Sequence, residues 1–177
     1  MNFLALDTTM DSIAIAISYN NKMITRIVNE GKKKHNSALL PAVEEMLLEN
    51  QMELDDMDAF GVVIGPGSFT GIRVGVSAIN AMSFALNKPV VEMTSLELIR
   101  TRYPNEDIIS LIDCRHDNYY GGLFKGDKVE YLAISKTQLD TIPAKKILIE
   151  KPDPLLLLDT MKEKIKDKIF VKRAKPF

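Results

Sequence analysis

The chain has 177 residues, of which 46% are hydrophobic and 27% are charged, with a formal net charge of -1. These totals indicate one globular domain or two small lobes, and the near-neutral balance favours no class of charged partner. Cys114 is the only cysteine, which excludes an intramolecular disulfide, and the apolar stretches are expected to fall short of a membrane span. We therefore expect a cytoplasmic protein with no membrane partner.

The first 103 residues alternate between strand and helix patterns. Three short strands are expected between residues 2 and 28, with a turn at Asp7-Thr8-Thr9 and a hairpin at residues 19–22. Helices are expected over residues 37–50, capped by Ser37, and over residues 70–86, on either side of an apolar strand at 60–64. A strand at 90–91 and a helix over 95–102 complete the order βββαβαβα.

Residues 104–177 show a second and shorter series of strand and helix patterns. A strand over 107–113 ends in Asp113, as the first strand of the chain ends in Asp7. Strands at 118–124 and 129–134, short strands at 147–149 and 169–171, and a helix over 155–166 are expected to follow. This echo predicts two related lobes, residues 1–103 and 104–177, each bringing an aspartate-bearing turn to a shared cleft.

Two turns are candidates for contact with a phosphate or nucleotide. An aspartate at a strand end followed by threonines suits hydrated Mg²⁺ and anionic oxygens, although such residues also simply cap a hairpin. The glycines of Gly65-Pro66-Gly67-Ser68 allow another group to approach the mouth of a helix closely, but the run is neither a Walker A loop nor a dinucleotide fingerprint. The candidate phosphate-facing residues are Asp7, Thr8, Thr9, Gly65, Gly67, Ser68 and Asp113.

The two long helices are candidates for a contact with another subunit. Small residues recur at helical spacing along the second helix, so another helix can approach it closely, or the helix can pack tightly on the chain's own sheet. The first helix adds an apolar stripe. The candidate interface residues are Ser37, Leu39, Leu40, Val43, Gly71, Arg73, Val74, Gly75, Ala78 and Met82.

Signals for metal binding are weak, because His35 and His116 are the only histidines and lie far apart in the sequence. We expect no metal site. The basic residues 32–34 and the basic segment 161–177 are each consistent with a solvated face or with a weak contact to RNA phosphate.

Several segments carry a resemblance to a known family. They are Leu4-Ala5-Leu6-Asp7-Thr8-Thr9, residues 35–43, Gly65-Pro66-Gly67-Ser68-Phe69-Thr70-Gly71, Thr94-Ser95-Leu96-Glu97, Asp113-Cys114-Arg115 and Tyr119-Tyr120. Together they resemble the TsaB family of bacterial proteins, most densely over residues 1–125. The resemblance implies an α/β fold of two ribonuclease-H-like lobes, of the actin-like, Hsp70-like and sugar-kinase-like (ASKHA) class, with the second lobe shortened.

The resemblance also implies a function. A TsaB-like chain would be a non-catalytic subunit that pairs with a TsaD-type transferase, and with a TsaE-type ATPase, for threonylcarbamoylation of adenosine in tRNA. It would contact tRNA only through the complex, form a homodimer when alone, and require no cofactor, with ATP or ADP bound weakly at most. The catalytic paralogue carries a histidine-rich metal segment where residues 91–97 of this chain have no histidine.

Two alternatives remain open at this point. An ATPase or phosphotransferase of the same superfamily, acting on a small molecule, would need Asp7, Thr8 and Asp113 to close on a Mg-nucleotide. A glycoprotease would need a metal site or an activated nucleophile, and the sequence offers neither.

Overall fold

The computed structural model describes residues 1–29 and 35–177, with side chains from residue 37 onward in the second range, so the basic residues 32–34 lie outside the described part. Its elements, in chain order, are β1 (Phe3–Asp7), β2 (Ile13–Tyr19), β3 (Lys22–Val28), α1 (His35–Glu49), the 3-10 helix η2 (Leu54–Asp56), β4 (Ala59–Val63), α2 (Phe69–Leu86), β5 (Val90–Met93), the 3-10 helix η3 (Leu98–Arg102), β6 (Ile108–Asp113), β7 (Asn118–Lys125), β8 (Lys128–Ser135), α3 (Lys136–Leu139), β9 (Lys145–Leu148) and α4 (Pro154–Lys166).

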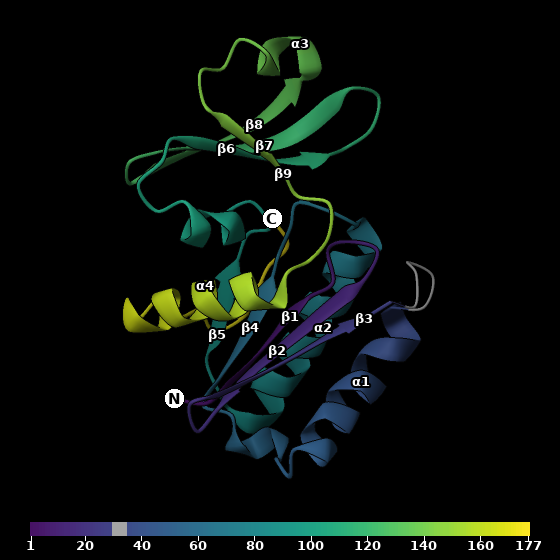
Figure 1. Ribbon diagram of the computed structural model, residues 1–177. Helices are drawn as coiled ribbons and strands as arrows, with labels where there is room; N and C mark the ends of the chain where they lie inside the picture. The colour runs from purple at the N-terminus through teal and green to yellow at the C-terminus, as the bar shows by residue number, and fades with distance from the viewer. Residues whose placement is uncertain (30–34) are drawn as a thin grey trace.

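The larger sheet has five strands in the order β3-β2-β1-β4-β5 (Figure 1). Strands β1, β2 and β3 form an antiparallel meander, whereas β4 and β5 run parallel to β1. The parallel connections run through α1 and α2, as helical crossovers do in βαβ units. This arrangement brings the carboxyl ends of β1, β4 and β5 to the same edge of the sheet.

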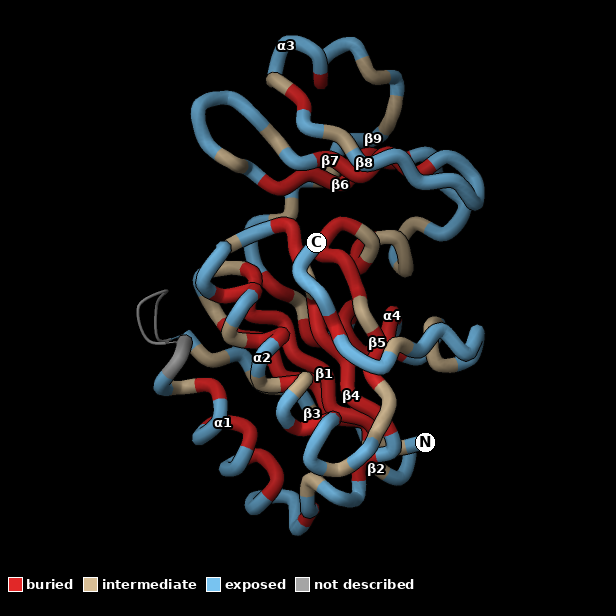
Figure 2. Tube along the Cα trace, turned by 180° about the vertical axis from the view of Figure 1, so that it is seen from behind, coloured by how far each residue is buried: buried red, intermediate tan, exposed pale blue. Residues whose placement is uncertain are grey.

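Helices cover both faces of this sheet, and the alternation of side chains along each strand assigns them. In β1, Leu4 and Leu6 belong to a buried cluster with Ile79 of α2, while Phe3 and Ala5 belong to a second cluster with Met161 of α4. Because helices cover both faces of the sheet, the residues of its central strands are buried throughout (Figure 2). The sequences of these strands are therefore continuous apolar runs.

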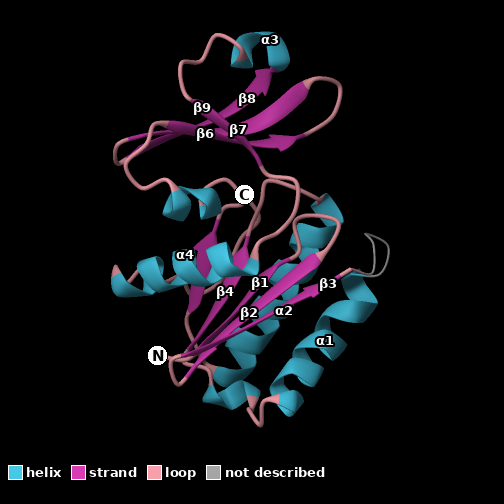
Figure 3. Cartoon of the chain, viewed as in Figure 1, coloured by secondary structure: helices cyan, strands magenta, loops and turns pink. Residues whose placement is uncertain are grey.

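The smaller sheet has four strands in the order β8-β7-β6-β9, with β6 and β9 parallel (Figure 3). One face packs on α3 and the loop after it through a small cluster that includes Ile109, Leu111 and Leu139. On the other face, Ile108 and Phe124 join the cluster of α4 and η3. The predicted α/β class with two sheets is therefore confirmed.

The chain crosses back to the larger sheet after β9. Helix α4 packs on that sheet through Leu157 and Met161, and Val171 forms an isolated bridge with Val90 at the edge of β5. Residues 104–177, predicted as the second lobe, are thus divided in space: β6 to β9 make the smaller sheet, and Pro154 onward covers the larger one.

Three local expectations were wrong. The helix expected over 95–102 is a turn at 95–97 followed by the 3-10 helix η3; the Thr94 hydroxyl and the Glu97 carboxylate each accept a hydrogen bond from the other residue's backbone N–H, which is the capping-box pattern of a helix start. The strand expected at 169–171 is the single bridge of Val171. Helix α1 begins at His35, so Ser37 lies inside it and is not its cap.

Helix α2 also departs from the expectation about apolar length. It has 18 residues and a mean hydropathy of 1.3, so by length and composition alone it could cross a membrane, as many core helices of soluble proteins could. In this fold one side of α2 is buried against β4 and the other is exposed.

Candidate functional site

The turn after β1 is buried and internally bonded. Asp7 is 2% exposed, and Thr8 and Thr9 are fully covered. The Asp7 carboxylate accepts bonds at Oδ1 from the Thr9 backbone N–H (2.9 Å) and the Thr9 hydroxyl (2.7 Å). The Thr8 hydroxyl donates to the Gly71 carbonyl of α2 at 2.6 Å.

The Gly65-Pro66-Gly67 turn after β4 lies directly against this first turn. The Gly65-Pro66 peptide is cis, and Gly65 and Gly67 have φ of 116° and 156°. A Cβ on Gly67 would lie 2.4 Å from the Thr9 carbonyl oxygen, so only glycine allows this approach. The Ser68 N–H donates to the same oxygen at 2.6 Å.

Ser95 joins the two turns from a third segment. Its hydroxyl lies 2.9 Å from the Pro66 carbonyl and 3.2 Å from the Thr9 hydroxyl, and its N–H donates to the Gly65 carbonyl at 2.8 Å. Ser95 is not among the site residues predicted from the sequence. Its role depends on a contact between residues 86 positions apart, which no local pattern signals.

The structure therefore brings together six of the seven candidate phosphate-facing residues but bonds several of them to one another. The close approach that the glycines permit is used by the chain itself. Asp113 is not among them: it is exposed at the end of β6 and accepts a bond from the Arg115 N–H at 2.7 Å. The pocket that Asp7 lines does not include Asp113.

Asp7 faces a small pocket between the linker after β9 and the larger sheet. This pocket of about 200 Å³ is also lined by Arg102, Leu148 and Asp153. Burial raises the pKa of the Asp7 carboxyl above its ordinary value, against the opposing effect of the two Thr9 hydrogen bonds. Asp7 therefore favours protonation more than a solvated aspartate does.

The glycines of α2 pack against the turn after β1. A Cβ on Gly71 would lie 1.9 Å from the Thr8 carbonyl oxygen, and one on Gly75 would lie 2.3 Å from Thr8 Oγ1. Thr8 therefore occupies the space beside these two glycines, which favours the alternative of tight packing within the chain, and their place at a subunit interface stays a prediction. Among the other candidates, Leu39, Val43 and Met82 are buried, Val74 and Ala78 are half-buried, and Ser37, Leu40 and Arg73 are exposed.

What remains exposed is an apolar face on α1 and α2. A groove of about 590 Å³ runs between the two helices, lined by Leu39, Leu40, Phe69, Thr70, Arg73, Val74, Ser77 and Ala78. The Arg73 guanidinium stacks 3.8 Å from the centre of the Phe69 ring. Leu48, Phe69 and Phe84 are exposed and were not among the sequence candidates, because helical periodicity alone does not show which residues the sheet leaves uncovered.

Within the described residues, no group of three or more His, Cys, Asp or Glu side chains is arranged to hold a metal ion.

Comparison with known proteins gives a consistent result. A family model, tRNA N6-adenosine threonylcarbamoyltransferase (TsaD), matches residues 22–169. The chain is 31% identical over 127 residues to the tRNA threonylcarbamoyladenosine biosynthesis protein TsaB of Bacillus subtilis, covering 71% of this chain and 56% of that protein. It is 29% identical over 133 residues to the protein of the same name from Haemophilus influenzae, covering 73% and 56%. The chain thus spans about half the length of these curated relatives.

A solved structure matches over the whole chain. YeaZ from Pseudomonas aeruginosa superposes with a TM-score of 0.81 at 21% identity, covering 100% of both chains. This likeness concerns the fold. It agrees with the predicted actin-like class of two sheets with helices on both faces of the larger one.

Proposed function

The chain belongs to the family of the tRNA N6-adenosine threonylcarbamoyltransferase TsaD, and TsaB proteins are among its curated relatives. From this premise we propose that it is an accessory subunit of tRNA threonylcarbamoylation. In this proposal it pairs with a TsaD-type transferase in the cytoplasm, and the transferase carries out the chemistry. A TsaE-type ATPase acts on the assembled pair, and two copies of this chain pair when the transferase is absent.

The exposed apolar face of α1 and α2 carries the proposal. Leu40 is 55% exposed and Phe69 is 68% exposed, on either side of the groove between the helices. Exposed apolar surface of this kind, beside a groove and continuous over two helices, is typical of a surface that a partner covers. The Arg73-Phe69 pair presents a cation and a flat ring in the lining of the groove, a combination enriched at interfaces.

The buried turn at Asp7-Thr8-Thr9 supports the proposal that this chain is not itself the transferase. The hydroxyls of Thr8, Thr9 and Ser95 bond to other groups of the same two turns and of α2. A phosphate would have to displace these bonds and the backbone contact at Gly67. The proposal therefore requires no cofactor and assigns no catalytic residue.

The interface is tested by placing a charge on the exposed apolar face of α1. Leu40→Glu would bury an unpaired carboxylate against the partner, and we expect the affinity for a TsaD-type subunit to fall about 100-fold or more. Leu155→Glu is the matched control, because Leu155 is 51% exposed on α4, which covers the opposite face of the sheet. Binding measured by calorimetry should be lost only in the first variant. Equal affinities for both variants would remove α1 and α2 from the interface.

The function is tested by omission. We would combine tRNA, threonine, bicarbonate, ATP, the adenylate-forming enzyme, and TsaD-type and TsaE-type subunits, with and without this chain. Nucleosides would be measured by chromatography with mass detection. Modified adenosine formed only with the chain supports the proposal, and equal yields without it contradict the proposal.

A further inference from the structure

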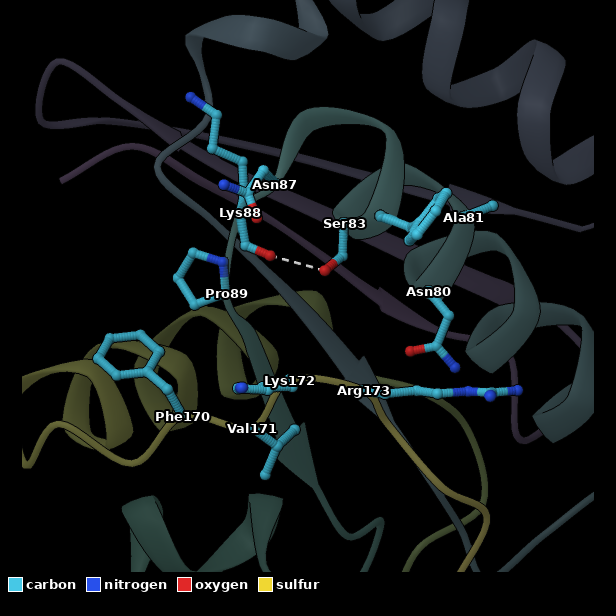
Figure 4. Close-up of a pocket in the computed structure, with 11 residues that line it drawn as sticks. Asn80, Ala81, Ser83, Asn87, Lys88, Pro89, Phe170, Val171, Lys172 and Arg173 are labelled. Atoms are coloured by element: carbon cyan, nitrogen blue, oxygen red, sulfur yellow. Dashed lines mark hydrogen bonds between the residues drawn. The ribbon is translucent and has the colours of Figure 1, made fainter.

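A groove of about 890 Å³ lies between the C-terminal end of α2 and residues 170–173, away from the Asp7 turn (Figure 4). Its lining includes the side chains of Phe84, Lys88, Phe170, Lys172 and Arg173. The proposed pairing with a transferase rests on the other groove, at Leu40, Phe69 and Arg73, and none of these residues lines this one.

The charge of the groove is one-sided. Its lining residues include three cations and no carboxylate. Lys88 is partly neutralised, since its Nζ lies 3.7 Å from Asp55 Oδ1. Lys172 and Arg173 are exposed, and neither forms an ion pair with the described residues. Lys172 and Arg173 are therefore two consecutive cations that are exposed to solvent without a neutralising carboxylate in the part of the chain that the structure describes.

The groove also presents aromatic rings to solvent. Phe84 is 90% exposed and Phe170 is 37% exposed, and neither belongs to a core cluster. In Figure 4 the Phe170 ring lies beside Pro89, with the Lys172 side chain next to it and Arg173 extending toward Asn80. An exposed ring and two cations thus lie within one short segment, residues 170–173.

The backbone that carries these side chains is held at both ends. Val171 and Val90 exchange backbone hydrogen bonds of 3.1 and 2.8 Å. The Asn80 amide donates to the Ala174 carbonyl at 3.0 Å and accepts from the Ala174 N–H at 2.8 Å. Lys172 and Arg173 lie between these anchors, so their positions relative to α2 are defined before any ligand arrives.

We propose that this groove binds a single-stranded segment of RNA. Single strands are recognised by cations that pair with the phosphates and by rings on which unstacked bases lie, and the groove presents both. An acidic peptide would use the cations but not the rings, and a duplex would keep its bases away from Phe84 and Phe170. The inference goes beyond the proposed function, because an accessory subunit need not touch RNA itself.

The electrostatic half is tested by the salt dependence of binding. The full chain would be titrated into a fluorescein-labelled single-stranded RNA of about ten nucleotides, at salt concentrations between about 50 and 200 mM. Lys172→Ala/Arg173→Ala should make the slope of log K against log salt shallower by about 1.4, because each phosphate contact on a single strand contributes about 0.7. Lys125→Ala/Lys128→Ala removes the same charge from the exposed β7–β8 hairpin and should leave the slope unchanged.

The contribution of aromatic stacking is tested by the affinity at constant salt. Phe170→Ala should weaken binding by about 5- to 150-fold, the usual effect of removing one stacking ring, without changing the salt slope. Tyr120→Ala, at an exposed aromatic residue of β7, is the control and should bind as the unchanged chain does.

Several results would overturn the inference. These are no measurable binding by the unchanged chain, equal effects of the groove and control variants, or equally tight binding of poly-glutamate or of duplex RNA. The titration contains no transferase subunit. Its failure is therefore distinct from a failure of the omission assay, which tests the accessory role.

Discussion

Gly75→Ala is the change whose effect can be worked out most fully from the structure. The new methyl group would lie 2.3 Å from Thr8 Oγ1, the atom that donates the 2.6 Å hydrogen bond to the Gly71 carbonyl. Overpacking costs about 2 kcal/mol, and displacing the buried hydroxyl from its acceptor costs about 2 kcal/mol more. Alanine is favoured over glycine inside a helix by about 1 kcal/mol, which leaves a net loss of about 3 kcal/mol.

The change in the free energy of unfolding caused by Gly75→Ala should reverse its sign when Thr8 is already alanine. In that background the clashing oxygen is absent, and the nearest remaining Thr8 atom, Cβ, lies 3.4 Å from the new methyl group. Gly75→Ala should then be neutral or stabilising by about 1 kcal/mol, from helix propensity alone. At Gly71 the clash is with the backbone oxygen of Thr8, so Thr8→Ala should not rescue Gly71→Ala.

The assay is urea unfolding of the four proteins of the Thr8 and Gly75 cycle, followed by circular dichroism. In the unchanged background, Gly75→Ala should lower the free energy of unfolding by about 3 kcal/mol, or Tm by about 6 to 12 °C. Additive effects, agreeing within about 0.5 kcal/mol, would show that Gly75 and Thr8 do not interact and would refute the packing argument.

Two further predictions concern the buried Asp7 carboxyl and the hydrogen bonds between Asn80 and Ala174. Because burial raises the Asp7 pKa, this carboxyl contributes most to stability at low pH, and the contribution is lost as pH rises through its folded-state pKa. The difference in free energy of unfolding between the unchanged chain and Asp7→Asn, from urea titrations at pH 4 to 8, should therefore fall with pH. A difference that rises with pH would contradict the raised pKa. Asn80→Ala leaves the buried Ala174 N–H and carbonyl without partners, so amide hydrogen exchange in residues 171–177 should accelerate. Ser77→Ala, at an exposed position one turn earlier on α2, is the control and should leave the exchange rates unchanged.

The strand and helix order of the larger sheet could be predicted from local patterns. The strands β1, β2 and β4 are buried on both faces, and their continuous apolar runs identify them. The 3-10 geometry of η3 could not be predicted, because the local Thr94-x-x-Glu97 pattern marks a helix start without distinguishing an α-helix from a 3-10 helix, and the contact that holds Ser95 at Pro66 joins distant segments. Helix α4 was expected, but an amphipathic pattern does not show which of two sheets its apolar side covers.

The candidate site divides in the same way. The density of glycine from Gly65 to Gly75 correctly predicted a close approach, since a missing Cβ is a local property. The partner of that approach is the Thr8-Thr9 backbone, more than fifty residues away, and no local pattern could identify it. The same contacts bury Gly71 and Gly75, whereas Leu40 and Phe69 are exposed on α1 and α2.

The sequence by itself determined the class of fold, the position of both turns and the family to which the chain belongs. These follow from short-range features: the period of apolar residues, the φ angles that glycine permits, and runs of residue types. Only the tertiary structure decided that the two turns bind each other, that α4 returns to the larger sheet and which side of α2 stays exposed. Each of these depends on which distant surfaces exclude water together, a property of the folded chain that no local segment contains.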